Sequence, residues 1–256
     1  DSISGVLDKG FMLSGNNEPK SFNYPDLQLS NLDFKFYDGK DDYLYFRYDS
    51  LLDPIIIGYN NNVEVFGDLF VFSDKVFSYG SIKTNNSNFF SENFSYNQNL
   101  IVSEKTDVEL LSSNHLDNLM VAEGVFFKYS IDKNEMEFKS LFFDEKNFIF
   151  PEYDLSTSLT NATWFIDNQL LELKANSEET HSVYSQNKNF QNWNFISKSL
   201  SLDIKNKMLL TSGVPDIQVA DAYILPDNEE VYIRENFKIE PLYNSILVLD
   251  TISEFH

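Results

Sequence analysis

Pairs of alternating apolar and polar runs recur along this chain, and a short polar segment separates the two runs of each pair. Leu200, Leu202 and Ile204 occupy every second position of one such run, with polar residues between them. Side chains in a β-strand point alternately to the two faces of a sheet, so a period of two predicts strands with one buried face. The same shape occupies residues 34–46, 127–138, 162–173, 200–210 and 222–233.

The polar segments have the composition of tight turns. Gly39 follows Asp38, and glycine accepts the positive φ that two-residue hairpin turns require. Pro226 presets φ for a turn in the last of the five segments. We therefore predict an all-β fold, built as an elongated array of mainly antiparallel hairpins. The alternation alone leaves open whether the array is a curved sheet, a sandwich or an irregular β-solenoid.

The domain organisation follows from what separates the runs. No Gly/Ser-rich or Pro-rich linker divides the 256 residues, so residues 1–256 are predicted to form a single elongated β domain. The sequence opens without Met, and its last alternating run, at 245–252, lies close to its final residue. We expect the chain to be a fragment of a larger protein.

Charge and composition exclude several classes of partner and site. The chain has 19 basic and 40 acidic residues, a net charge of −21, and no cysteine. Nucleic acid and anionic membrane surfaces repel such a chain. Disulfides, thiolate metal sites and a cysteine nucleophile are excluded. No apolar run approaches the roughly 20 residues that span a bilayer, which predicts no transmembrane segment.

The residues that usually carry catalysis do not form a recognisable pattern. His115, His181 and His256 lie too far apart to match a zinc motif, and we expect each at the surface. The sequence contains no GxSxG motif and no glycine-rich phosphate loop. We therefore predict no catalytic residue, no cofactor and no metal site, and a protein that is not an enzyme.

One acidic cluster leaves an alternative open. Asp38, Asp41 and Asp42 stand close together at the first polar segment. Calcium is bound by several carboxylate oxygens, although the twelve-residue loop of the common calcium motif is absent. The cluster is interpreted as an acidic turn, with calcium binding as the alternative.

The aromatic residues offer the main candidate surface. Between residues 62 and 96 phenylalanines fall on both faces of the predicted strands, so they form either a closed core or an apolar groove that holds lipid. Trp164 lies within an apolar run and is expected in the core. Trp193 is the candidate exposed aromatic, or else a loop anchor. The candidate core or groove residues are Phe66, Phe70, Phe72, Phe77, Phe90 and Phe94.

Residues 217–256 carry a resemblance to a known group of proteins. The matching positions are Val219 to Asp221, Pro226-Asp227, Arg234 to Asn236 and Asp250-Thr251. This stretch resembles a segment of very large, β-rich, uncharacterised envelope proteins of Bacteroidetes. The run at 63–80 is similar in style to the strand repeats of OstA and AsmA-like envelope proteins.

The resemblance implies a location in the cell envelope, in the periplasm or at the cell surface, and a role without catalysis. The expected function is thus a structural or interaction module of a cell-envelope protein, with an unidentified protein or envelope component as its partner. One alternative is a lipid-handling β-groove of the OstA or AsmA-like kind. The other is a domain that binds or acts on polysaccharide.

Overall fold

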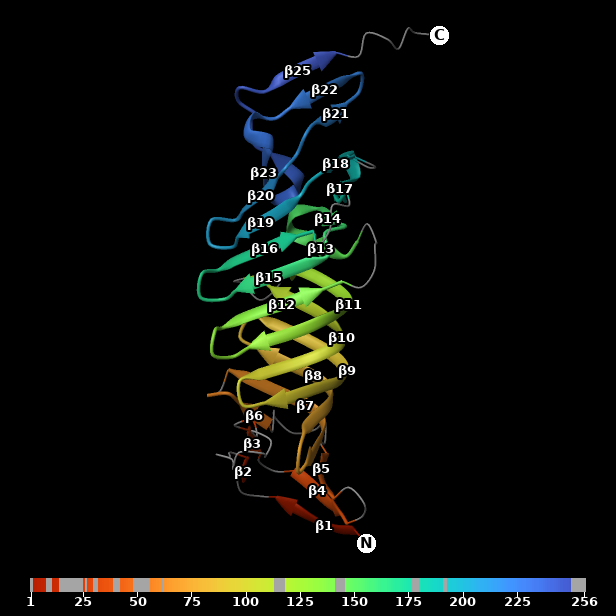
Figure 1. The fold of residues 1–256 in the computed structure, drawn as a ribbon, viewed down its shortest axis with the longest axis vertical. Coiled ribbons are helices and arrows are strands. Elements are labelled where there is room, and N and C mark those ends of the chain that lie inside the picture. The colour runs from red at the N-terminus through yellow and green to blue at the C-terminus, as the bar shows by residue number, and fades with distance from the viewer. Residues whose placement is uncertain are drawn as a thin grey trace, which may run out of the picture. The chain divides into compact units, whose positions relative to one another are not determined.

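The predicted all-β class is confirmed. The computed structural model describes residues 2–7, 11–13, 25, 27–29, 32–38, 42–47, 56–60, 62–112, 118–140, 146–175, 180–190 and 193–249. Within these ranges the chain forms β-strands and four short 3₁₀ turns but no α-helix, and the strands run across Figure 1 as a succession of arrows. The chain divides into two compact units, residues 1–115 with 124–134, and residues 116–123 with 135–256.

The first unit is built on one antiparallel ladder. The strands pair in the order β1 (Ser2–Leu7), β4 (Leu32–Tyr37), β5 (Tyr43–Arg47), β7 (Val63–Phe72), β8 (Val76–Thr84), β9 (Ser87–Asn97) and β10 (Leu100–Leu111). A shorter row joins the start of β7 and consists of β2 (Phe11–Leu13), β3 (Leu27–Leu29) and β6 (Ile56–Gly58). The pairing of β4 with β5 confirms the hairpin predicted at residues 34–46.

Alternate positions of these strands form the core of the first unit. In β7, Leu69 and Val71 are buried while the residues between them are half-buried on the opposite face. Phe89 of β9 stacks on Phe127 of β11 (Asn118–Ser130), with ring centroids 4.4 Å apart. The alternation seen in the sequence therefore corresponds to alternate packing of side chains toward the core and away from it.

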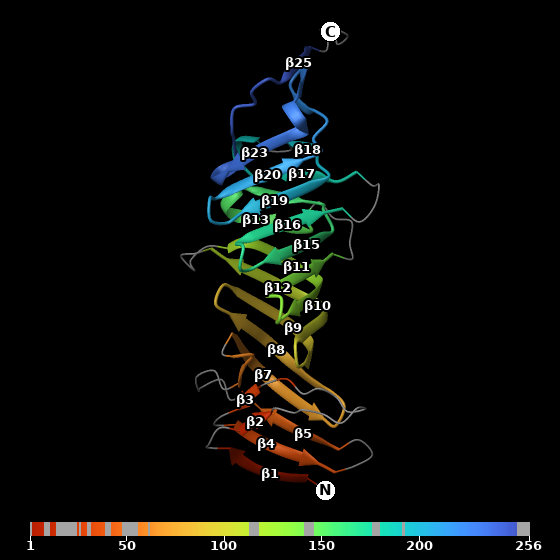
Figure 2. The same cartoon turned by 60° about the vertical axis from the view of Figure 1, so that its left-hand side comes forward.

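The second unit contains two antiparallel ladders that the chain visits in turn. One ladder pairs β12 (Glu135–Lys139), β15 (Asn161–Phe165), β16 (Leu170–Lys174), β19 (Ser199–Asp203), β20 (Met208–Ser212), β23 (Glu230–Arg234) and β24 (Lys238–Ile239). The other pairs β13 (Phe148–Phe150), β14 (Leu155–Thr157), β17 (Ser182–Ser185) and β18 (Asn194–Ile196). Figure 2 shows β15, β16, β19 and β20 as neighbours, in agreement with this register.

Most strands of both ladders bury every second residue, whereas all three residues of β14 are buried. Leu171 and Leu202 lie directly opposite each other and are fully buried, as are Phe148 and Phe150 of the other ladder. The hairpins predicted at 162–173 and 200–210 are confirmed by the pairing of β15 with β16 and of β19 with β20. Trp164 is 4% exposed, which confirms its predicted place in the core.

The hairpin predicted at residues 222–233 is wrong. Strand β22 (Ala222–Leu225) pairs with β21 (Ile217–Val219) and β25 (Ile246–Leu249) in a separate three-stranded sheet, whereas β23 pairs with β20. The intervening segment is a 3₁₀ turn in which Asn228 has a φ of 55°. The Glu229 carbonyl accepts a bond from the Val214 amide, and this bond directs the chain away from β22.

Candidate functional site

One side of the first unit carries a continuous set of aromatic rings, which we call the aromatic face. Its rings lie on the outward side of β4, β5, β7 and β8, opposite the core. Facing positions in the register place them side by side, because Tyr45 is opposite Phe70 and Phe70 is opposite Phe77. The aromatic face consists of Tyr37, Tyr43, Tyr45, Phe70, Phe72, Phe77 and Tyr79.

These rings stack on one another across the strands. The ring centroids of Tyr37 and Tyr43 are 4.7 Å apart, those of Tyr43 and Phe72 are 4.9 Å apart, and those of Phe70 and Phe77 are 4.9 Å apart. The last pair is tilted by only 11°. These spacings match the distance between neighbouring strands. Tyr45 and Tyr79 are instead tilted against Phe70, by 37° and 60°.

Charged groups border the aromatic face. Lys75 Nζ lies 4.7 Å from the ring centroid of Phe72, in the geometry of a cation–π contact. Burial, together with the neighbouring Asp68 carboxylate, raises the pKa of the Tyr45 hydroxyl. The rings therefore form an apolar centre with a polar rim that carries both signs of charge.

Beside the aromatic face, the first unit has a groove of about 700 Å³ that crosses β7 to β10. The groove lies where two strands part. Residues 95–97 of β9 pair with 100–102 of β10, and residues 87–90 pair with 107–110, but the residues between them do not pair. In the same stretch the alternation between buried and exposed residues shifts by one position in both strands.

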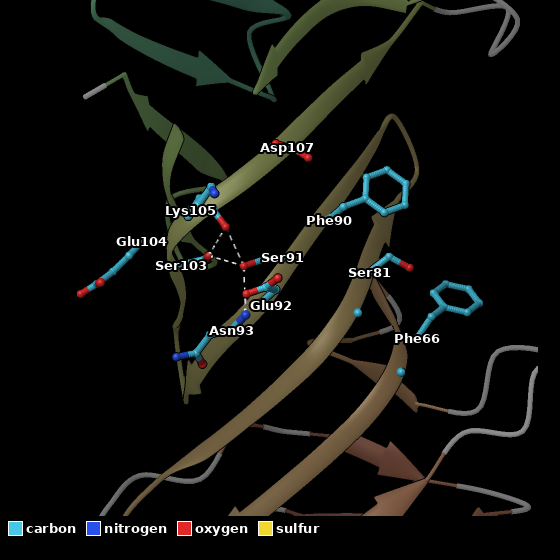
Figure 3. Close-up of a pocket in the computed structure, with 12 residues that line it drawn as sticks. Phe66, Ser81, Phe90, Ser91, Glu92, Asn93, Ser103, Glu104, Lys105 and Asp107 are labelled. Carbon is cyan, nitrogen blue, oxygen red and sulfur yellow. Dashed lines mark hydrogen bonds between the residues drawn. The ribbon is translucent and has the colours of Figure 1, made fainter. Parts of the chain in front are cut away.

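Serine hydroxyls replace the missing ladder bonds. The Ser91 and Ser103 hydroxyl oxygens are 2.7 Å apart, and both hydroxyls bond to the Lys105 carbonyl, at 2.7 and 3.2 Å. The Asn93 backbone amide donates to the Ser91 hydroxyl oxygen at 3.0 Å. Figure 3 shows this cluster on one wall of the groove. Its hydroxyls satisfy one another, so the cluster holds the strand geometry.

Two glycines form the floor of the groove. Gly67 and Gly80 face each other across β7 and β8, with φ of 119° and 132°. A Cβ on Gly67 would lie 2.0 Å from the Tyr79 carbonyl oxygen. The two backbones approach closely because neither residue carries a side chain, which leaves the groove open above them.

The six candidate phenylalanines lie on two faces. Phe94 is fully buried in the core. Phe66, Phe70, Phe72 and Phe77 are half-buried on the outward side, and Phe90 is 44% exposed there. The four tyrosines of the aromatic face were not among the residues predicted from the sequence, although Tyr43 and Tyr45 alternate with apolar residues at 43–47.

Trp193 is half-buried in the second unit and anchored at its indole. The indole N–H donates to the Gln218 carbonyl at 2.7 Å. The ring packs edge-on against Phe195 and Phe237, with centroids 6.2 and 5.6 Å away. The group borders an apolar pocket of about 490 Å³. Trp193 thus combines the two predicted roles, as a loop anchor with part of its ring exposed.

The histidine prediction is partly wrong. His181 is 3% exposed, and its Nδ1 bonds to the Ser158 carbonyl at 2.8 Å. Its interior position arises because it precedes β17, whose alternate residues are buried. His115 and His256 lie outside the described residues.

The described part of the chain contains no group of three or more acidic or histidine side chains placed to hold a metal ion. Asp38 and Asp42 are exposed, and Asp41 lies outside the described residues, so the acidic turn, with calcium binding as its alternative, stays a prediction. No helix in the described ranges is long and apolar enough to cross a membrane.

Comparison of the chain with family models, with curated proteins and with solved structures finds no match. The residues that carry the resemblance to envelope proteins lie around β21, β22 and β23, and Asp250 and Thr251 fall outside the described residues. That resemblance stays a prediction.

Proposed function

We propose that this chain is a non-enzymatic interaction module of a cell-envelope or cell-surface protein, and that a protein partner binds to its aromatic face. The observation that carries the proposal is the row of stacked rings on the outward side of β4, β5, β7 and β8. These rings are half-buried or exposed, and Tyr79 is 45% exposed. Contiguous apolar patches with a polar rim are typical of interaction sites.

The chemistry of the aromatic face favours a protein over a saccharide. Tyrosine, phenylalanine and arginine are enriched in the centres of protein interfaces, and charged residues gather at the rims. Here Arg47 and Lys35 flank the tyrosines of β5 and β4 and are exposed. A sugar ring stacks on the open face of an aromatic ring, whereas Tyr43 and Phe70 each already stack on a neighbouring ring. A continuous surface of stacked rings suits an apolar protein surface.

The envelope location is supported by the resemblance of residues 217–256. The net charge of −21 is compatible with that role, because it keeps a chain with exposed aromatic rings apart from other copies of itself. Partner recognition then depends on the aromatic centre, and the charges at the rim set its specificity.

Site-specific photo-cross-linking tests this proposal in the cell that makes the protein. A benzophenone amino acid at Phe77 is expected to form an adduct with one discrete protein. The matched control is Tyr232, an exposed aromatic of β23 in the second unit (40% exposed). With the purified partner, Phe70→Ser combined with Tyr45→Ser should weaken binding at least about tenfold, because truncated interface aromatics carry much of the binding energy.

The result that contradicts the proposal is equally specific. Adducts at Phe77 that contain only lipid or only glycan would assign the aromatic face to a different ligand. Equal adducts at Phe77 and Tyr232 would show that the aromatic face has no partner of its own. Circular dichroism of each variant verifies that the β-fold is retained.

A further inference from the structure

A single row of facing residues crosses the groove beside the aromatic face. Phe66 of β7, Ser81 of β8, Phe90 of β9 and Asp107 of β10 each lie directly opposite the next. Neighbouring strands are spaced by about 4.8 Å, so the Cα atoms of Phe66 and Phe90 lie about 10 Å apart with only the small Ser81 between them. Figure 3 shows Ser81 between the two rings. We call the space above Ser81 the slot.

Phe90, one of the two rings that flank the slot, differs from the rings of the aromatic face. Phe90 is 44% exposed, and the structure describes no aromatic ring stacked on it. Phe66 has Lys83 Nζ 4.9 Å from its centroid, and Lys83 does not line the groove. The spacing across Ser81 thus leaves room for another ring between the two phenyl groups. The stacked rings of the aromatic face leave no such room between them.

Polar side chains line the groove beyond Phe90. Glu92, Glu104 and Asp107 supply three carboxylates, and Asn93 supplies an amide. Asp107 Oδ1 accepts a bond from the Gly124 amide at 2.8 Å. The structure describes no ion pair at Glu92 or Glu104, and both are exposed. These groups can therefore accept hydrogen bonds from a ligand.

We propose that the slot binds one ring of a short neutral or amino-sugar oligosaccharide. The C–H groups on the two faces of a sugar ring pack on Phe66 and Phe90, and its hydroxyls donate to the carboxylates and to Asn93. The groove is lined by three carboxylates and by one cationic side chain, that of Lys105. This excess of negative charge disfavours uronic acids and sulfated sugars. The groove volume of about 700 Å³ lies within the range of specific ligand sites. This site is independent of the protein contact proposed above.

Calorimetric titration of the whole chain with three oligosaccharide probes tests the assignment. The probes are a neutral glucose oligomer, a glucosamine oligomer and a galacturonate oligomer. The neutral or the amino-sugar probe is expected to bind, and galacturonate at least about tenfold more weakly, as like-charge contacts are costly. Ser81→Phe fills the slot and Phe90→Ala removes one wall, so each should weaken binding at least about tenfold.

The matched control is Tyr232→Ala, which truncates an exposed ring of β23 that lies outside both the groove and the aromatic face. This variant is expected to bind the saccharide within about twofold of the unchanged chain. A thermal melt of each variant verifies folding.

Three outcomes would overturn the proposal. The first is that none of the three probes binds to the unchanged chain. The second is that Ser81→Phe, shown to be folded, binds as well as the unchanged chain. The third is that tryptamine, a flat aromatic cation, binds in the slot while the saccharides do not, which would assign the slot to aromatic ligands.

Discussion

At the scale of single residues, the facing glycines of β7 and β8 are the tightest constraint in the first unit. A Cβ on Gly80 would lie 2.1 Å from the Phe66 carbonyl oxygen, and one on Gly67 would lie 2.0 Å from that of Tyr79. Both contacts are with backbone atoms, which cannot move without breaking the ladder. Both residues also have φ values that L-residues with a side chain rarely adopt.

Replacing Gly67 with alanine should therefore destabilise the chain strongly. We expect Gly67→Ala to lower the free energy of unfolding by more than about 4 kcal/mol, because strain and backbone overlap act together. Gly124→Ala is the control, since Gly124 also has a positive φ but its Cβ would meet only the flexible Lys105 side chain at 3.7 Å. That change should cost about 1 kcal/mol. Urea unfolding measures both, and equal losses would show that the close approach is not needed.

A second residue-scale prediction concerns acid stability. The Asn206 backbone amide donates to Asp203 Oδ1 at 2.9 Å and lowers the pKa of that carboxyl below its ordinary value of 3.8. A lowered folded pKa contributes stability above the ordinary value, and this contribution is lost as the pH falls through the lower folded pKa. Asp203→Asn should therefore reduce the loss of stability below about pH 4.

The control for this prediction is Asp132→Asn, which removes a turn carboxylate with no hydrogen bond described in the structure. Denaturant melts at pH 3 to 6 compare the three chains. A pH profile of Asp203→Asn identical to that of the unchanged chain would contradict the assigned role of the turn.

At the scale of elements, the one-residue shift of the alternation in β9 and β10 decides which of their side chains face the core and which face outward. Phe90 and Phe94 are four residues apart, so strict alternation places them on one face. The structure places Phe94 in the core and Phe90 outside, because two residues of β9, Glu92 and Asn93, lie opposite the single residue Tyr79 of β8. A bulge of this kind redirects every side chain that follows it.

Truncation of these two rings should have different costs. Phe94→Ala should lower the free energy of unfolding by about 3 to 5 kcal/mol, because it leaves a cavity in the core. Phe90→Ala should change it by less than about 1 kcal/mol, since its ring is 44% exposed. Chemical denaturation of both variants checks the difference, and comparable losses would place both rings in the core.

The elements also show how much the sequence predicts. Hairpins at 34–46, 162–173 and 200–210 follow from alternation and turn chemistry alone. The pairing of β22 with β25 could not be predicted from local pattern, because β25 lies more than twenty residues further along the chain. Local periodicity reports which residues share a face and carries no information on which strand lies next to it.

The candidate site was less predictable than the hairpins for a related reason. Alternation places Phe66, Phe70 and Phe72 on one face of β7 but does not say whether that face is the inner or the outer one. The signal for the groove was present as two adjacent phenylalanines, Phe89 and Phe90, followed by three polar residues. Such a break in period two marks a bulge, and its position relative to neighbouring strands depends on the register.

At the scale of the whole molecule, the chain buries Leu and Val on the inner sides of its ladders and displays aromatic rings on an outer side of the first unit. Many other rings, among them Phe89, Phe94 and Phe127, are buried in the core, so only the outward set departs from the usual preference of large aromatic residues for the interior. Cross-strand stacking partly compensates, because each stacked pair contributes roughly 0.5–1.5 kcal/mol beyond the area that it buries. The remaining exposure is what makes the aromatic face available to a partner.

The most direct test of this account is the accessibility of two adjacent positions in β7. Phe70 lies on the aromatic face and is half-buried, whereas Val71 points into the core and is 6% exposed. The chain has no cysteine, so Phe70→Cys and Val71→Cys each introduce a single thiol. We predict rapid labelling of the thiol at position 70 by a water-soluble maleimide, and protection of the thiol at position 71 until the chain unfolds. Protection at position 70 with rapid labelling at position 71 would contradict this prediction.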